Sequence, residues 1–138
     1  MKKGICIPTE YKRDLLHTFE LTVEITDKYQ KSLDSKKDRS TSVSEYYEFS
    51  VKLSECVLLA NSTAKSISEQ IEKADAVDDF TAMEHLNALL EKYIQYRANV
   101  ESFLAATEAA KSTDDFLRVL NHETDVLARK TIVIKSQI

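Results

Sequence analysis

The apolar residues in the middle of the chain recur every three or four positions without interruption. The recurring positions are Tyr46, Ser50, Leu53, Val57, Ala60, Ala64, Ile67, Ile71 and Ala74, and Ser50 alone is not apolar. The frame one residue earlier, which includes Glu45, Lys52 and Gln70, is mostly polar. Such spacing is typical of an α-helix that turns one apolar stripe towards its neighbours. We therefore expect one long central helix to organise the fold.

Three further segments repeat the helical spacing and are separated by short polar stretches. The expected helices cover about 8–34, 80–111 and 116–138, and the expected turns are 35–41, 75–79 and 112–115. Residues Ser42 to Glu45 match a capping box, in which a serine hydroxyl and a glutamate side chain bond reciprocally to backbone N–H groups. We expect the central helix to begin there and to end near Ala74.

The composition favours helices over sheets. The 138 residues include one glycine and one proline, so few positions suit the tight turns that hairpins need. The expected fold is all-α, an antiparallel up-down-up-down four-helix bundle of long helices that spans 8–138, with 1–7 as an N-terminal tail. One alternative stays open: the β-branched run from Thr131 to Ile134 is either helix or a strand paired with Ile5 to Ile7.

The predicted inner stripe of the third helix contains one charged residue. Arg97 follows Tyr93 and precedes Val100 in an otherwise mostly apolar series. Folding the third helix onto the fourth about a turn near Ser112 brings Arg97 within one turn of Glu123. Two interpretations stay open: the two side chains meet inside the bundle, where such a pair sets the register of helices while adding little net stability, or the arginine extends its head past apolar neighbours to solvent.

Charge and hydropathy exclude several classes of function. The formal net charge is -4 with both signs interspersed, whereas a nucleic-acid-binding protein usually carries a basic excess on one face. No apolar run approaches the roughly 18 residues that a membrane span needs. Cys6 and Cys56 stand far apart, as expected of reduced thiols. We expect a cytoplasmic protein that binds neither nucleic acid nor membrane.

The motifs of known catalytic and metal sites are missing from the sequence. The three histidines lack the Glu-x-x-His spacing of di-iron bundles, and the acidic stretch 75–79 lacks the glycine and closing glutamate of a calcium loop. The sequence also contains no glycine-rich phosphate loop and no nucleophile elbow. We expect a non-enzymatic protein without a metal or cofactor.

Four apolar residues fall outside the predicted core. Leu21 and Ile25 on the first helix and Val51 and Leu58 on the second become one continuous outer strip when the two helices fold back on each other. A continuous exposed apolar surface usually marks a partner surface. We expect these residues to form the interface of a homodimer, or of a complex with another helical protein.

A second hypothesis comes from a cluster of tyrosines around the inner arginine. Tyr46, Tyr93, Tyr96 and Arg97 are expected to line a space between helices, which is a common location for ligand pockets. On this alternative the protein is a sensor or carrier of a small molecule.

Overall fold

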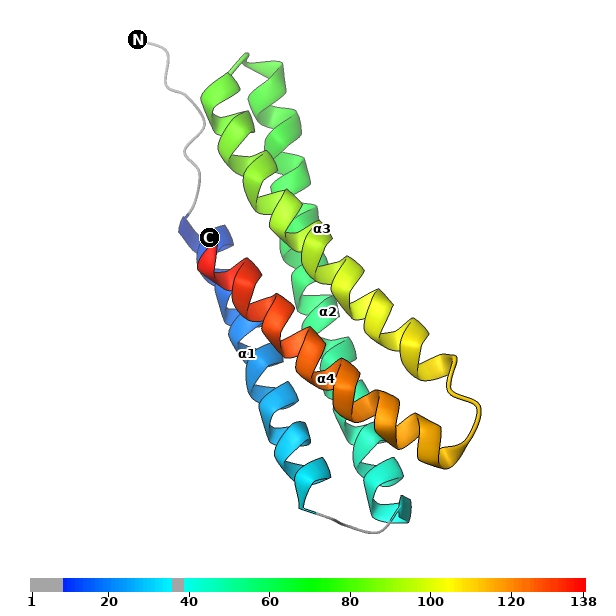
Figure 1. The fold of residues 1–138 in the computed structure, drawn as a ribbon. Coiled ribbons are helices and arrows are strands. Elements are labelled where there is room, and N and C mark those ends of the chain that lie inside the picture. Colours follow the sequence, from blue (N-terminus) through cyan, green and yellow to red (C-terminus); the bar gives the residue numbers. More distant parts are fainter. Residues whose placement is uncertain (1–8, 36–38) are drawn as a thin grey trace.

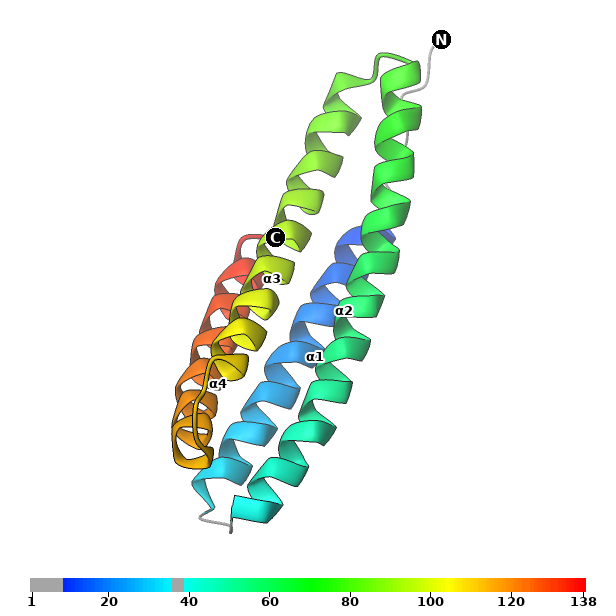
Figure 2. The ribbon, with the colours of Figure 1, turned by 90° about the vertical axis from the view of Figure 1, so that its right-hand side faces the viewer.

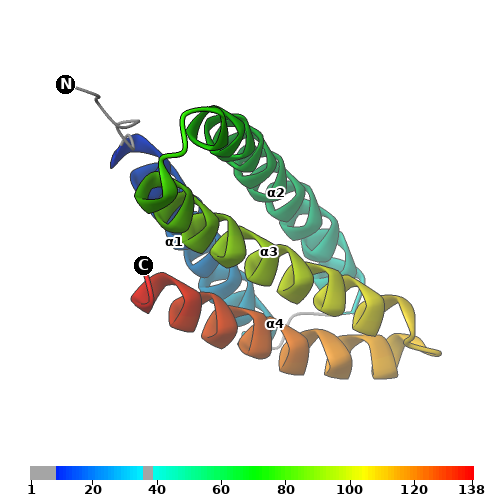
Figure 3. The ribbon, with the colours of Figure 1, turned by 90° about the horizontal axis from the view of Figure 1, so that it is seen from above.

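The computed structural model describes residues 9–35 and 39–138, and four antiparallel helices account for almost all of them (Figure 1). The helices are α1 (Thr9–Asp34), α2 (Arg39–Ala76), α3 (Phe80–Glu108) and α4 (Thr113–Ser136). Each helix packs against its neighbours in sequence, and α1 also packs against α4, which closes the bundle (Figure 3). The all-α four-helix bundle predicted from the sequence is confirmed.

The two turns that precede α3 and α4 carry the expected caps. The Asp79 side chain accepts a hydrogen bond from the Ala82 amide, and the Ser112 hydroxyl accepts one from the Asp115 amide. Before Asp79, Asp78 adopts a positive φ of 55°, a conformation that aspartate tolerates better than most residues. Both caps lie where the sequence predicts them, but the second turn is earlier than predicted, because α3 ends at Glu108 and residues 113–115 already belong to α4.

The predicted start of the second helix is wrong. The helix α2 begins at Arg39, so the capping-box sequence 42–45 already lies inside it. A capping pattern marks the start of a helix only where the preceding backbone cannot continue it, and 39–41 contain neither proline nor glycine. The predicted loop 35–41 is correspondingly too long, and its residues 36–38 lie outside the described part of the chain.

The β-branched run near the C-terminus is helical. It lies within α4, and Thr131 and Ile134 are both buried in the core. The local propensity of this segment is compatible with either helix or strand, and tertiary packing determines that it is helical. The residues Ile5 to Ile7 and the N-terminal tail 1–7 lie outside the described residues.

The second helix is much longer than α1 and α4. Its 38 residues correspond to about 57 Å, so the α2–α3 hairpin extends beyond the start of α1 and the end of α4 (Figures 1 and 2). At the tip of this hairpin the Phe80 side chain is 69% exposed. Phe80, the first residue of α3, is therefore at the surface and not in the core.

The buried face of α2 is wider than predicted. Leu53, Ala60, Ala64, Ile67 and Ala74 are buried as expected, but Phe49 and Cys56 from the frame assigned to the polar side are buried too. Because α2 packs against α1 on one side and against α3 on the other, its apolar stripe must cover two contacts, unlike the single seam of a coiled coil. The strict spacing therefore identified the helix correctly and its buried face only in part.

Of the two interpretations of Arg97, the buried pair with Glu123 is wrong, and the arginine head lies in solvent. Arg97 is exposed and donates to the Glu101 carboxylate (3.1 Å) and to the Tyr93 hydroxyl (3.3 Å), both on its own helix. Tyr96, the residue before it, is fully buried instead. A seven-residue repeat drifts by about 20° per heptad relative to a straight helix, enough to move one position out of the core over the length of α3. The arginine gains by keeping its charge in water.

Threonine supplies all the buried polar residues among the described positions. Five of these six threonines lie on α1 and α4: Thr18, Thr22, Thr26, Thr124 and Thr131. The hydroxyl groups of the three on α1 donate to the carbonyl four residues earlier, at 2.8 to 3.0 Å. Because Thr22 donates its own proton in this way, the Tyr96 hydroxyl is the donor in the 2.7 Å bond between them. This bond links α1 to α3 across the core.

Candidate interaction surface

A long groove runs along the outer side of the α1–α2 pair. It consists of two hollows of about 430 and 310 Å³ that share three lining residues, Ile25, Lys28 and Lys52. The larger hollow extends towards the end of α1, and the smaller one extends towards the middle of α2. Across the larger hollow the Ser32 hydroxyl of α1 donates to the Glu45 carboxylate of α2, so the two helices are linked there above the groove floor.

The floor of the groove is mainly apolar. In the larger hollow Tyr29 of α1 stacks on Phe49 of α2, with ring centroids 4.7 Å apart and planes 8° from parallel. In the smaller hollow the apolar lining comes from Leu21, Ile25 and Leu59. Burial, reinforced by the neighbouring Tyr46 and Glu45, raises the pKa of Tyr29 well above its ordinary value. Tyr29 therefore stays neutral and acts as an apolar surface with a polar tip.

Charged side chains of both signs line the rims of the groove, and like charges lie level with each other in its smaller hollow. Lys28 and Lys52 line both hollows and so face each other at their junction. Glu24 and Glu55 line only the smaller hollow, one turn further along. Within 9–35 and 39–138, none of these four side chains forms an ion pair. Like charges therefore face each other at the junction of the two hollows, whereas at the far end of the larger hollow the serine-to-glutamate hydrogen bond links α1 to α2.

The structure separates the four residues predicted to form one interface strip. Leu21 and Ile25 are partly buried and line the groove. Val51 and Leu58 are 58% and 65% exposed, but neither belongs to the lining of either hollow. Successive helical residues point about 100° apart, so Leu58 is turned well away from Leu59, which does line the groove. The groove-lining residue Leu59 thus belongs with Leu21 and Ile25, a grouping that the sequence pattern did not indicate.

The four residues of the predicted ligand pocket are not brought together. Tyr96 is in the core on Thr22, and Tyr93 donates to Asn61 while accepting from Arg97. The Tyr46 hydroxyl instead lies 3.4 Å from that of Thr107, which is about 21 Å further along α3 than Tyr93. Tyr46 therefore belongs to a different end of the bundle from the other three.

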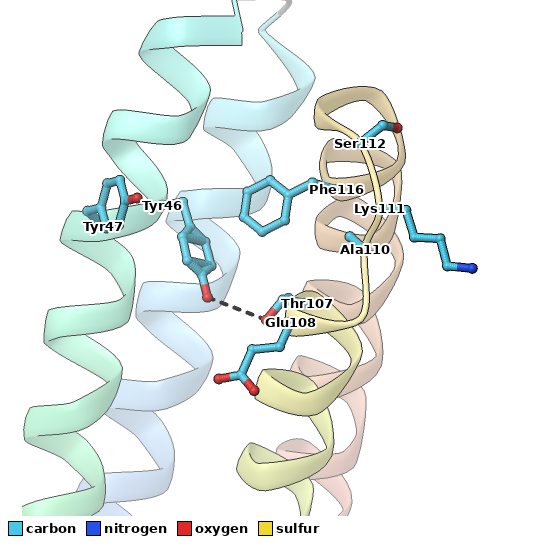
Figure 4. Close-up of a pocket in the computed structure, with 8 residues that line it drawn as sticks. All are labelled: Tyr46, Tyr47, Thr107, Glu108, Ala110, Lys111, Ser112 and Phe116. Atoms are coloured by element: carbon cyan, nitrogen blue, oxygen red, sulfur yellow. Dashed lines mark hydrogen bonds between the residues drawn. The ribbon is translucent and has the colours of Figure 1, made fainter.

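Tyr46 lines a separate hollow of about 510 Å³ beside the α3–α4 turn (Figure 4). Its ring meets that of Phe116 edge to face, with centroids 5.1 Å apart. Lys111 points its ammonium group away from the rings, and Glu108 lies below the Tyr46 hydroxyl (Figure 4). The two charged residues oppose each other in sign, and the rings pack against one another, so the hollow presents no set of groups that converge on one ligand.

Neither a metal-binding cluster nor a membrane-spanning helix is present among the described residues. No group of three or more histidine, cysteine, aspartate or glutamate side chains comes together there in a way that suits a metal ion. Nor does any described helix combine the length and apolar character that crossing a lipid bilayer requires.

Comparison with known proteins returned no match. No protein-family model fits the chain, and it matches neither a curated protein nor a solved structure.

Proposed function

We propose that this protein is a non-enzymatic interaction module that acts as a homodimer joined through the α1–α2 face. The observation that carries the proposal is the open groove with its apolar floor. Of the nine large hydrophobic side chains exposed in the described chain, Leu59 lines the groove, next to the partly buried Leu21 and Ile25. Exposed apolar surface concentrated in this way usually marks a protein–protein contact.

A second copy of the chain is the partner that the charges favour. A twofold dimer uses the same surface on both subunits, so that surface must complement itself. The groove rims carry lysines and glutamates in similar number, whereas an interface with a strongly charged partner would carry one dominant sign. We place this function in the cytoplasm, because the Cys56 thiol is free and buried in the described structure and reduced thiols are typical of that compartment.

The small-molecule alternative has less support. Its four residues are divided between two parts of the bundle, and Arg97 and Tyr93 satisfy each other on the surface of α3. Tyr46 alone of the four lines one of the hollows described above. We therefore carry forward the homodimer as the single proposed function.

The proposal is tested by changing Leu59 to glutamate and measuring the molar mass by light scattering after size exclusion. A buried carboxylate in an apolar contact is strongly unfavourable, so Leu59→Glu should convert the dimer to a monomer with unchanged helicity. Ile94→Glu is the matched control, because Ile94 is 57% exposed but lies on α3, away from the groove. A wild-type chain that is monomeric at high micromolar concentration would overturn the proposal.

A further inference from the structure

Resting on the proposed dimer, we infer that the two copies pack antiparallel, groove against groove, about a twofold axis perpendicular to the helices. The axis crosses α1 between Glu24 and Lys28 and crosses α2 between Lys52 and Glu55. These two crossing points lie at the same height in the bundle, because all four residues line the same hollow. One axis therefore passes through both without distorting either helix.

This axis pairs the four charged residues nearest to it, out of the seven that line the groove, with opposite charges. Rotation about it places Lys28 of one copy against Glu24 of the second, and Lys52 of one copy against Glu55 of the second. By symmetry each pairing occurs twice, so four ion pairs form at the interface. Complementary charges at an interface fix the register of the partners and disfavour wrong arrangements.

The parallel arrangement of the same two faces is disfavoured by the same residues. A twofold axis along the bundle keeps heights unchanged and places α1 of one copy opposite α2 of the other. Lys28 would then meet Lys52, and Glu24 would meet Glu55, since these pairs lie level across the groove. Like charges brought face to face at an interface are unfavourable. The like charges that lie level within one copy thus favour the antiparallel dimer over the parallel one.

The shape of the groove agrees with the antiparallel arrangement. Leu59, which is 49% exposed, and Phe49 lie at comparable distances on opposite sides of the proposed axis. Rotation therefore places Leu59 of one copy over the larger hollow of the second, where Tyr29 and Phe49 form the floor. An apolar side chain that fills a pocket near the middle of an interface is the usual form of a hot spot.

A charge swap tests the inferred pairing. Lys52→Glu places two glutamates opposite each other in both symmetric pairs, and we expect dimerisation about tenfold weaker by analytical ultracentrifugation. The double variant Lys52→Glu with Glu55→Lys restores opposite charges and should regain near wild-type affinity. Lys65→Glu is the control, because Lys65 is exposed on α2 beyond the groove and should leave affinity unchanged.

Cysteine crosslinking separates the geometry from the existence of the dimer. In a Cys6→Ser, Cys56→Ala background, which removes the native thiol that lines the smaller hollow, Ile25→Cys lies next to the axis and should crosslink to itself with a short bismaleimide. A mixture of Lys28→Cys and Lys52→Cys chains should crosslink only in the parallel arrangement. If the dimer forms the mixed crosslink and its affinity is unchanged by Lys52→Glu, the antiparallel geometry is wrong, but the proposed dimer stands. If the wild-type chain is monomeric, both the antiparallel geometry and the proposed homodimer are wrong.

Discussion

The two sides of α1 differ in the way they are closed. On the side towards α4, Gln30 donates to Asn121 and Lys135 pairs with Glu20, so polar side chains bridge the two helices at the surface. On the side towards α2, the Ser32 hydroxyl donates to a glutamate of α2 at one end, but in the smaller hollow two lysines lie level with each other, as do two glutamates, above an apolar floor. Both sides have hollows of several hundred Å³, so size alone does not distinguish them.

This difference indicates which side is complete within one chain. Bridged rims satisfy their charges locally, and a partner would have to break those pairs to bind there. Unpaired charges above apolar surface gain from a second molecule instead, because that molecule supplies both the opposite charges and the missing cover. If the aromatic side of α1 and the threonines that face the core stabilise the fold, substitutions there should change the free energy of unfolding.

The largest loss of stability is expected from Phe49→Ala. Phe49 is 3% exposed, stacks on Tyr29 and meets Phe103 edge to face, so its removal leaves a cavity between three helices. We expect a decrease of about 3–5 kcal/mol in the free energy of unfolding, measured by urea denaturation. Leu58→Ala, at a side chain that is 65% exposed, is the control and should change it by less than about 0.5 kcal/mol.

Alkaline pH should destabilise the fold through the buried tyrosines. Burial raises the pKa of Tyr29 and of Tyr96 above the ordinary value of 10.0, although the Thr22 hydrogen bond lowers that of Tyr96 in part. The unfolded chain therefore loses these protons first, so stability is complete below that value and decreases as the pH rises through it. The loss approaches about 1.4 kcal/mol per pH unit for each tyrosine.

Denaturation midpoints between about pH 9 and pH 11 measure this effect. Tyr96→Phe should reduce the pH dependence because it removes one of the two titrating groups. Tyr47→Phe, at a tyrosine that is 65% exposed, should not change it. An equal pH dependence in the wild type and the Tyr96→Phe variant would contradict the assignment to the core.

A smaller loss is expected from Thr22→Val. The Tyr96 hydroxyl then has no acceptor in the core, which costs about 1–3 kcal/mol. Combining Thr22→Val with Tyr96→Phe should recover part of this loss, because no buried hydroxyl remains unpaired. Thr26→Val is the comparison: its hydroxyl bonds only to carbonyls of its own helix, so the change should be smaller. Equal losses at both threonines would show that the link between α1 and α3 contributes nothing.

The smallest expected effect is a gain in stability. Thr124 is fully buried on α4, and its hydroxyl lacks a hydrogen-bond partner within the described residues. Thr124→Val keeps the shape and removes this unpaired group, so the free energy of unfolding should rise by about 1 kcal/mol. Thr131→Val should not give this gain, because the Thr131 hydroxyl donates to the Leu127 carbonyl at 2.8 Å. Thermal melts of the two variants provide the measurement.

Local patterns in the sequence were sufficient to predict the helices and most of their turns. The spacing from Tyr46 to Ala74 lies within one unbroken helix, and the aspartate and serine caps before α3 and α4 are where the sequence places them. These features depend on neighbours within a few residues. The start of α2 could not be predicted in the same way, because helix propagation upstream of a capping motif depends on the whole segment 39–45.

The candidate surface was predicted only in part. Leu21 and Ile25 were found because they fall outside the inner stripe of the first helix, yet Leu59 and the floor formed by Tyr29 and Phe49 were missed. Glu24 and Lys28 on α1, and Lys52 and Glu55 on α2, are visible in the sequence as opposite charges three or four residues apart. Their alignment across two helices requires knowing how far α1 and α2 are offset along the bundle.

The sequence by itself determined that the chain forms four helices, because helical periodicity and caps are local properties. Only the tertiary structure decided which side of each helix is buried, since that depends on the angle and the number of helices packed against it. Arg97 and Tyr96 illustrate the limit: a rotation of one position sends the arginine to water and the tyrosine to Thr22. The groove between α1 and α2 is likewise a property of two packed helices, and neither segment contains it alone.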